Sequence, residues 1–507
     1  MDDLNFDYYR ELSPNFMRWC LLLNGIVAPE LTEESCHCEL GFGQGVSANI
    51  NAAATPGKFF GNDFNPSHAA QAKEFAKASG AEAKFFEDSF EEFSKRDDLP
   101  QFDSIGVHGV WSFVDAENRG HILEIARRHL QSGGMFYNSY NCLPGAAPHA
   151  PLRELLAIGY RYKTNPADDA EERINSAMNF VEDLLDANPA YLKVVPSFKN
   201  RFEQIKREEV SYIAHEYLNS DWDLMYFKDV AELFKSAKLD FAATAIPIES
   251  KEDMFLPERM KNFLKRVDNP IAHEQLQDYF INRNFRKDIF VRGLRRLSTT
   301  EIYDKILMTR YVLNKPAADV PMNVSVHLGD LNLDESLYRP LLEYVERDNF
   351  RPKYLQEYFM KNNLSAGSLI ELITILVYAG HVLPCQDESA VKQVKKSCEQ
   401  LNAHICERSE FGETINVLAS PLTGGGIEVG RFQQLFLAQY KAGSKTSDRL
   451  ADEVWKIISR NRERMIVSDV WNSERFLETP EENIAHLKNL AEDFLSKLLP
   501  IYKALLL

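Results

Sequence analysis

The sequence lacks the cysteine patterns of a metal-binding or disulfide-rich protein. None of its seven cysteines forms a CxxC pair, and Cys36 and Cys38 have no second Cys/His pair to complete a zinc site. The first residues, MDDLNFDYYRELSPNF, have neither a basic start nor an apolar core, so we expect no signal peptide. These absences indicate a cytoplasmic protein with reduced thiols and no bound metal.

Long apolar runs and an excess of basic charge are also absent. The longest apolar stretch, SLIELITILVYAGHVLP, contains Glu371 and is short for a membrane span. The chain has 58 Lys and Arg against 75 Asp and Glu, a net charge of −17. Sequence-independent nucleic-acid binding needs clustered cations. We therefore expect no membrane span and no nucleic-acid partner.

Short apolar runs alternate with helical patterns between residues 35 and 140. The candidate strands are SCHCEL, KFFGND, AKFFE, FDSIGVHGV and GGMFYNSYN. Between the second and third, PSHAAQAKEFAKASG reads as a helix, with Pro66 at its start and Gly80 at its end. Regular alternation of strands and helices predicts a parallel, doubly wound α/β sheet.

Differences in amino-acid composition divide the rest of the chain into further segments. Residues 151–209 are helical and charged, which predicts a helical insertion. SYIAHEYLN, YFKDVAELFKSAKL and DFAATAIPIE read as strand, helix and strand that complete the same sheet. The expected domains are a catalytic domain over 1–250, a helical connector over 251–298, a winged-helix-like domain over 299–390 and a mostly helical domain over 391–507.

A glycine turn, ELGFGQG, follows the first strand and opens a helix. Gly41, Gly43 and Gly45 would let a nucleotide-like ligand lie on bare backbone at the carboxyl edge of the sheet. The dinucleotide motif GxGxxG does not fit, because the third glycine comes one residue early. Glu39, just before the turn, stands where class I methyltransferases carry an acidic residue.

Acidic residues also follow the next two strands. Asp63 lies 18 residues after Gly45 and is placed to accept hydrogen bonds from ribose hydroxyls, while Asp88 is placed to meet an adenine amine. Phe64 and Ser89, their neighbours, are assigned to the same cofactor site. The structural alternative is a tight turn with surface acids.

These segments resemble a known family. ELGFGQG, GNDFNP, FDSIGVHGVWSFV and GGMFYNSYNCLPG are similar to bacterial methyltransferases that carry a methyltransferase regulatory domain, among them lysine methyltransferases of outer-membrane proteins. The resemblance continues through YIAHEYLNSDWDLMYFKDVAELF, FRKDIFVRG and the winged-helix region. Phe42 replaces a usual cysteine and Trp111 a common tyrosine. The resemblance implies S-adenosylmethionine as cofactor, a protein lysine as acceptor and a homodimer through the insertion.

Lysine methylation requires a neutral amine. Neutralising a lysine of pKa near 10.4 at pH 7 costs about 4.6 kcal/mol, and a dry aromatic pocket lowers that cost. Trp111 follows the fourth strand, and Tyr140 and Asn141 end the fifth. Strand alternation puts Tyr137 and Tyr140 on opposite faces. We expect Tyr140, Asn141 and Trp111 to be catalytic.

Other residues keep two interpretations. His108 is either a general base or a hydrogen-bond partner of the backbone or cofactor. Cys142 reads as a small buried filler, and His215-Glu216 fails as a metal motif because Asn219 replaces the second histidine of H-E-x-x-H. The mixed charges of the winged-helix region favour a protein contact over DNA.

The predicted protein is thus a methyltransferase acting on protein lysines. The segment containing Tyr9 and Pro14 would fold over the cofactor, and the C-terminal domains would select the acceptor. One alternative is a small-molecule methyltransferase whose insertion serves as a lid. The other is a cofactor-binding regulator without turnover.

Overall fold

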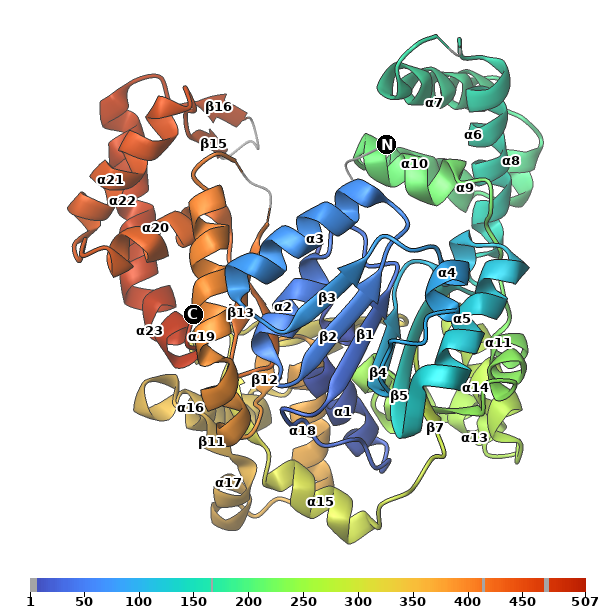
Figure 1. Ribbon diagram of the computed structural model, residues 1–507, viewed down its shortest axis with the longest axis horizontal. Coiled ribbons are helices and arrows are strands. Elements are labelled where there is room, and N and C mark those ends of the chain that lie inside the picture. The colour runs from blue at the N-terminus through green and yellow to red at the C-terminus, as the bar shows by residue number, and fades with distance from the viewer. Residues whose placement is uncertain (1–6, 166, 413–414, 469–473) are drawn as a thin grey trace.

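A seven-stranded sheet forms the centre of the N-terminal half (Figure 1). The structure, a computed structural model, describes residues 7–165, 167–412, 415–468 and 474–507. The strands are β1 (Cys36–Leu40), β2 (Lys58–Asn62), β3 (Ala83–Phe86), β4 (Phe102–Val107), β5 (Leu130–Asn141), β6 (Leu239–Thr244) and β7 (Phe285–Arg292). Their order is β3-β2-β1-β4-β5-β7-β6.

The sheet is mixed rather than fully parallel. Strands β1 to β5 pair in parallel, but β7 runs antiparallel to both β5 and β6. Strand β7 comes from the segment 251–298, which we expected to be a helical connector, so the sheet extends past residue 250. Arg286 and Asp288 make β7 look polar in sequence, yet both are fully buried because they pair with each other.

Helices cover both faces of the sheet. One face is packed by α1 (Pro14–Leu23), α2 (Val46–Ala54) and α3 (Pro66–Ser79), and the other by α4 (Phe90–Ser94), α5 (Ala116–His129) and α11 (Phe227–Lys235). Pro66 and Gly80 stand at the two ends of α3 as predicted, with Gly80 left-handed. Each face has its own apolar core.

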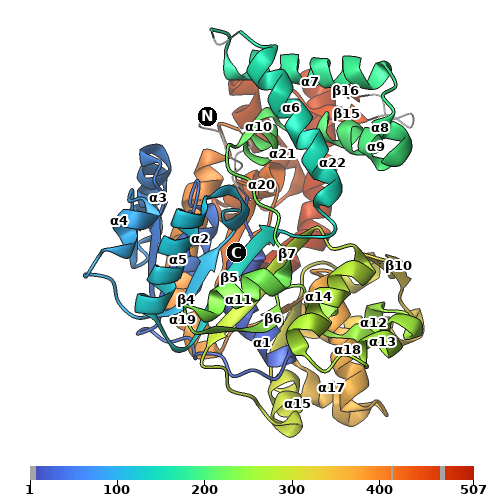
Figure 2. The ribbon, with the colours of Figure 1, turned by 90° about the vertical axis from the view of Figure 1, so that its right-hand side faces the viewer.

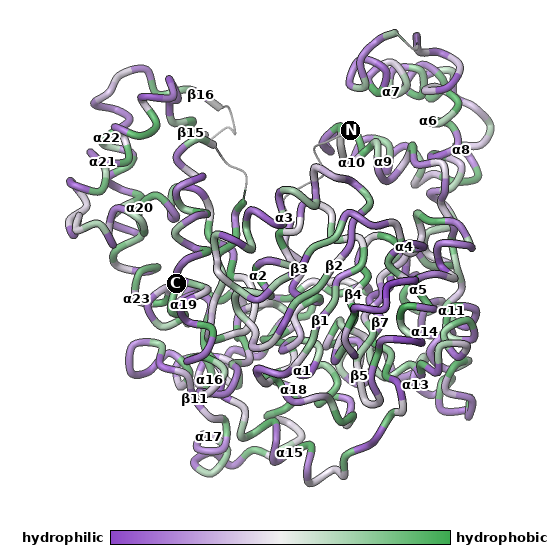
Figure 3. Tube along the Cα trace, viewed as in Figure 1, coloured by the Kyte–Doolittle hydropathy of each residue, from purple (hydrophilic) through white to green (hydrophobic). Residues whose placement is uncertain are grey.

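The insertion is helical and projects from the sheet (Figures 1 and 2). It comprises α6 (Ala150–Tyr162), α7 (Ala170–Asp186), α8 (Tyr191–Val194), α9 (Ser197–Ile205) and α10 (Val210–Leu218). The strand predicted over 211–219 is wrong, because this segment is α10. Hydrophobic and hydrophilic residues alternate along α6 and α7 (Figure 3), and their apolar side chains form a separate core with α9 and α10.

Three short helices lead into β7. They are α12 (Glu252–Phe255), α13 (Glu258–Leu264) and α14 (Pro270–Ile281). Helix α14 carries Asp278, which is fully buried and bonds Arg286 of β7 at 2.6 Å.

The C-terminal half is largely helical with small sheets. Its helices are α15 (Thr299–Leu307), α16 (Glu335–Phe350), α17 (Leu355–Lys361), α18 (Ala366–Tyr378), α19 (Glu388–Arg408), α20 (Arg431–Lys441), α21 (Ser447–Arg460), α22 (Pro480–Asp493) and α23 (Leu499–Ala504). Its strands are β8 (Arg310–Leu313), β9 (Asn323–Val326), β10 (Gly329–Asn332), β11 (Lys353–Tyr354), β12 (Val382–Pro384), β13 (Val417–Ser420), β14 (Gly425–Glu428), β15 (Ile466–Ser468) and β16 (Glu474–Phe476). Among the described residues, no helix is both long and apolar enough to cross a membrane.

The two halves share one hydrophobic core. Helix α19 packs against α2 and α3. Buried hydrogen bonds join the halves: Ser13 Oγ donates to the Gly424 carbonyl at 2.8 Å, and Gln386 Nε2 donates to the Ala54 carbonyl at 2.7 Å. The C-terminal half is therefore part of the support of the sheet.

Candidate active site

A cavity of about 1140 Å³ opens at the carboxyl ends of the parallel strands. Its lining comes from the glycine turn with the ends of β2, β3, β4 and β5, the start of β7, the segment 7–12, and the insertion. This is the edge at which open α/β sheets bind ligands. All the predicted cofactor residues line it, namely Glu39, Gly41, Gly43, Gly45, Asp63, Phe64, Asp88, Ser89 and His108.

The glycine turn is shaped for close approach of a ligand. Gly43 has φ +56°, and a Cβ built there would meet nothing within 4 Å, so bare backbone faces the cavity. Gly45, with φ +74°, is the N-cap of α2, and a Cβ there would come within 2.7 Å of the Ala72 side chain. Asp63 Oδ2 accepts the Gly43 N–H at 2.9 Å and fixes the turn. These positions favour glycine because L side chains avoid this conformation.

The carboxylates around the turn differ in their partners. The Glu39 carboxylate accepts no hydrogen bond from another described residue, and burial, with Asp63 nearby, raises the pKa of this carboxyl to about 8. Asp88 pairs with Arg96 at 2.8 Å. Ser89 forms a capping box with Glu92 at the start of α4. Thus Glu39 keeps its hydrogen-bonding capacity for a ligand.

Next to Asp63 lies a histidine that the sequence analysis missed. His68 Nδ1 lies 3.2 Å from Asp63 Oδ1, while its buried Nε2 has no partner among the described residues. The ring lines the cavity from α3. In the sequence, His68 is marked as a site residue only by its position in the first turn of the helix that begins beside Asp63. Phe64 is 78% exposed at the same edge.

His108 stands between the glycine turn and the insertion. Its Nδ1 lies 2.9 Å from the Tyr137 hydroxyl and 3.2 Å from Ser139 Oγ, and its ring stacks on Tyr9 with centroids 3.8 Å apart. Burial lowers the pKa of His108 to about 4. The imidazole is therefore neutral at pH 7 and serves as a hydrogen-bonding group.

Two predicted catalytic residues lie outside the cavity. Trp111 is fully buried against Phe234, with ring centroids 5.0 Å apart. The Tyr140 hydroxyl donates to Asp288 Oδ2 at 2.8 Å in the buried charge cluster. Alternation along β5 does put Tyr137 and Tyr140 on opposite faces, but the cavity lies on the Tyr137 side. Asn141 shares that side and lines the cavity, as expected.

Helix α10 supplies cavity residues that the sequence analysis did not assign. Tyr212, His215 and Glu216 line the cavity together. Their spacing of i, i+3 and i+4 puts them on one face of a helix. This spacing was not used in the sequence analysis, which interpreted the segment as a strand. The His215 ring lies 4.5 Å from Phe113. Burial lowers the pKa of His215 and raises that of Glu216.

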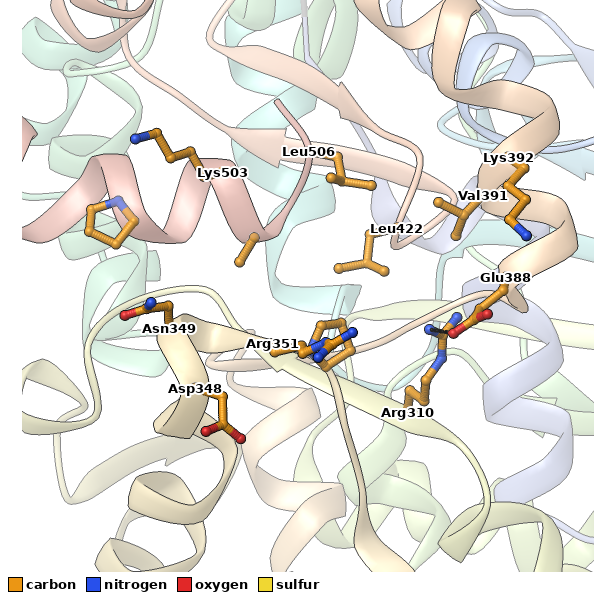
Figure 4. A pocket seen from close by; sticks show the side chains of 13 residues that line it. Arg310, Asp348, Asn349, Arg351, Glu388, Val391, Lys392, Leu422, Lys503 and Leu506 are labelled. Atoms are coloured by element: carbon orange, nitrogen blue, oxygen red, sulfur yellow. Dashed lines mark hydrogen bonds and ion pairs between the residues drawn. The ribbon is translucent and has the colours of Figure 1, made fainter. Parts of the chain in front are cut away.

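A second cavity, of about 820 Å³, lies in the C-terminal half (Figure 4). Arg310 pairs there with Glu388 at 3.1 Å, and Asp348 pairs with Lys353. Lys503 points away from the cavity and donates to the Tyr440 hydroxyl. Most of its charged side chains are thus held within the chain, and its lining shares no residue with the first cavity. Among the described residues, no group of three His, Cys, Asp or Glu side chains could hold a metal ion.

Sequence comparisons identify the family. A model for a methyltransferase domain matches residues 38–134, and a model described as a predicted methyltransferase regulatory domain matches residues 209–292. The protein sll1526 of Synechocystis is 35% identical, over 98% of this chain and 97% of its own. The chain belongs to the class I methyltransferases with a methyltransferase regulatory domain. The expected family is confirmed, and this methyltransferase uses S-adenosylmethionine as its methyl donor.

Structural comparison extends the shared fold over the whole methyltransferase. PKMT2 from Rickettsia typhi, in complex with AdoHcy, has a TM-score of 0.69 and covers 96% of this chain and 98% of its own, at 18% identity. The protein RP789 of Rickettsia prowazekii is 26% identical over 62% of this chain. The C-terminal half is therefore part of a fold found in other proteins.

Proposed function

We propose that this methyltransferase methylates lysine side chains of a protein substrate. The observation that carries the proposal is the charge of the cavity mouth beside the insertion. Asp115, Glu208 and Asp221 line this side and are exposed to solvent. Carboxylates at a cavity mouth raise the local concentration of a cationic side chain.

The cations on this side of the cavity are few and engaged. Arg201 donates to the Tyr217 hydroxyl at 2.8 Å. Burial lowers the pKa of both His149 and His215, so neither opposes the acidic charge at pH 7. The mouth is thus complementary to an ammonium group.

The interior of the cavity is aromatic. Tyr9, His108, Phe113, Tyr212 and Phe285 line it. An ammonium that moves from the acidic mouth into these surroundings loses hydration, which favours its neutral form. The exposed carboxylates would thus attract the lysine ammonium at the cavity mouth, and the aromatic interior would favour its loss of a proton. The name of PKMT2, a protein lysine methyltransferase with the same fold, agrees with the proposal.

We assign the cofactor to the glycine-turn side. Asp63 would hold the ribose hydroxyls, Asp88 the adenine amine and Glu39 the amino group of the cofactor, over the bare backbone at Gly43. S-adenosylmethionine supplies an activated methyl group on a sulfonium. Holding donor and acceptor in line contributes on the order of 7–11 kcal/mol to lowering the barrier. No covalent intermediate on the protein is needed.

Segment 7–12 would close over the bound cofactor. The Tyr9 N–H donates to Ser47 Oγ at 2.9 Å, and its ring covers His108. Glu11, in the same segment, pairs with Lys287 of β7 at 2.7 Å. These contacts tie the segment to both α2 and the sheet, so it excludes water from the place of transfer.

We further propose a homodimer through the insertion, in the cytoplasm. The insertion exposes Tyr162 at 70% and Val194 at 79%. All seven cysteines are free thiols, in keeping with a reducing compartment. We assign residues 299–390 to a winged-helix-like domain and 391–507 to a helical domain that presents the acceptor protein. Sedimentation of the purified protein tests the dimer, since a monomer would overturn it.

Methyl-labelled S-adenosylmethionine tests the proposed function. Incubation with the purified protein and a cell extract is expected to place label in acid-precipitable protein, on lysine, and stable to base. Label confined to small molecules would replace the proposal with a metabolite methyltransferase. Tight cofactor binding without transfer to any fraction would indicate a regulator.

A further inference from the structure

Helix α10 is fixed over the carboxyl ends of β4 and β5. The His215 ring packs on Phe113, just after β4, with ring centroids 4.5 Å apart. On the next residue, Glu216 Oε1 accepts a hydrogen bond from Asn141 Nδ2 at the end of β5, at 3.2 Å. The two contacts hold the Glu216 carboxylate at the cavity wall.

Glu216 has hydrogen-bonding capacity that the chain leaves unused. A carboxylate offers about four acceptor sites. Asn141 fills one, and no other described residue donates to Glu216. Arg201 and Arg153 lie near enough to favour the ionised form of Glu216, but neither donates a hydrogen bond to it: Arg201 donates to the Tyr217 hydroxyl and Arg153 to a main-chain carbonyl after α10. Because Glu216 lines the cavity, its remaining acceptor sites are within reach of a ligand bound there.

We propose that Glu216 and Asn141 together bind the acceptor ammonium group and orient its nitrogen toward the methyl donor. This inference rests on the proposed function. A lysine ammonium has three N–H donors. Glu216 would accept one N–H and Asn141 Oδ1 a second. The third proton would leave to solvent, and the lone pair it exposes would take the methyl group as the sulfonium of the donor becomes a thioether. The cation in turn replaces the hydration that Glu216 loses on burial, and so favours the ionised carboxylate.

The region matched by the regulatory-domain model would thus take a direct part in the reaction. That region begins at residue 209, and α10 is its first helix. Glu216 therefore lies in the segment described as regulatory, while its partner Asn141 lies on the methyltransferase sheet. The acceptor site is assembled from both regions.

Kinetics on a defined acceptor test the inference. The probes are acetyl-Gly-Gly-Lys-Gly-Gly-amide and extract protein, each with methyl-labelled S-adenosylmethionine. We expect Glu216→Gln, which keeps the shape and removes the charge, to raise the acceptor KM at least tenfold, as for loss of a charge-assisted hydrogen bond. The Kd for S-adenosylhomocysteine should stay unchanged. The matched control is Glu203→Gln, an exposed carboxylate of the same insertion outside the cavity.

Each other outcome is decisive. Equal acceptor KM in Glu216→Gln and Glu203→Gln, with lysine still methylated, overturns the inference and leaves the proposed function intact. A parallel weakening of S-adenosylhomocysteine binding places Glu216 in the cofactor site and also overturns it. Failure of the unmodified protein to label lysine in either probe removes both the proposed function and the inference. Asn141→Ala is expected to lower kcat, with S-adenosylhomocysteine binding retained.

Discussion

His108 Nδ1 lies 2.9 Å from the Tyr137 hydroxyl, while the ring of Tyr9 stacks on the same imidazole. Three segments thus meet at one neutral histidine: the end of β4, the centre of β5 and the N-terminal segment. Because His108 also lines the cavity, these contacts fix the orientation of one of its wall residues.

Replacing Tyr137 by phenylalanine removes the hydroxyl beside His108. We expect kcat to fall about two- to tenfold, because a net hydrogen bond contributes about 0.5–1.5 kcal/mol. Steady-state kinetics and calorimetric titration with S-adenosylhomocysteine measure the two quantities. A loss of cofactor affinity as large as the loss of kcat would show that the hydroxyl supports the cofactor instead.

Tyr140→Phe is the matched change on the opposite face of β5. It removes the donor to the buried Asp288, so we expect the free energy of unfolding to fall by about 1–3 kcal/mol. The turnover of the folded enzyme should stay unchanged, because Tyr140 lies outside the cavity. Denaturant unfolding and kinetics together check this. A selective loss of turnover at full stability would return Tyr140 to the catalytic set.

Asp63→Asn tests the cofactor side of the cavity. Asp63 holds the Gly43 N–H and is assigned to the ribose, so we expect the Kd for S-adenosylhomocysteine to rise at least tenfold, as for loss of a bond to a charged group. Isothermal titration measures the change. Asp98→Asn, at an exposed carboxylate outside the cavity, is the control. Unchanged affinity in Asp63→Asn would reject the ribose assignment.

Stability should fall in mild acid because of buried neutral histidines. Burial lowers the pKa of His37 to about 3 and that of His108 to about 4. The unfolded chain binds protons at these residues near pH 6.5, so it gains protons that the folded state excludes as the pH falls below that value. At about pH 5 each histidine then costs about 2 kcal/mol of stability.

His37→Gln isolates one of these contributions. The stability difference between about pH 7.5 and about pH 5 should shrink by about 2 kcal/mol relative to the unmodified protein. Denaturant unfolding at the two pH values gives the comparison. An equal pH dependence in both proteins would show that His37 is protonated alike in the folded and unfolded states.

Local patterns predicted which residues line the glycine-turn side of the cavity. The glycine turn and the acids Glu39, Asp63 and Asp88 each sit at a strand end, where neighbouring residues decide the conformation. Parallel strands then bring those ends to one edge. The position of each residue in the sheet therefore follows from short stretches of sequence.

The proposed acceptor side depends on contacts between distant segments. Alternation along β5 separates Tyr137 from Tyr140, but only the packing of other elements decides which face borders the cavity. Glu216 reaches Asn141 from 75 residues away. Strand β7 was missed because paired buried charges interrupt its apolar pattern.

The position of β7 in the sheet also determines when β6 can pair during synthesis of the chain. It lies between β5 and β6 in space but follows both in the chain, so β6 has no hydrogen-bonded neighbour in the sheet until residue 292 has been made. At about 5–20 residues per second, the ribosome adds the 48 residues after β6 (292 minus 244) within several seconds. During that interval the edge of β5 is open, and a nascent chain paused there would expose an unpaired strand to its neighbours on the polysome.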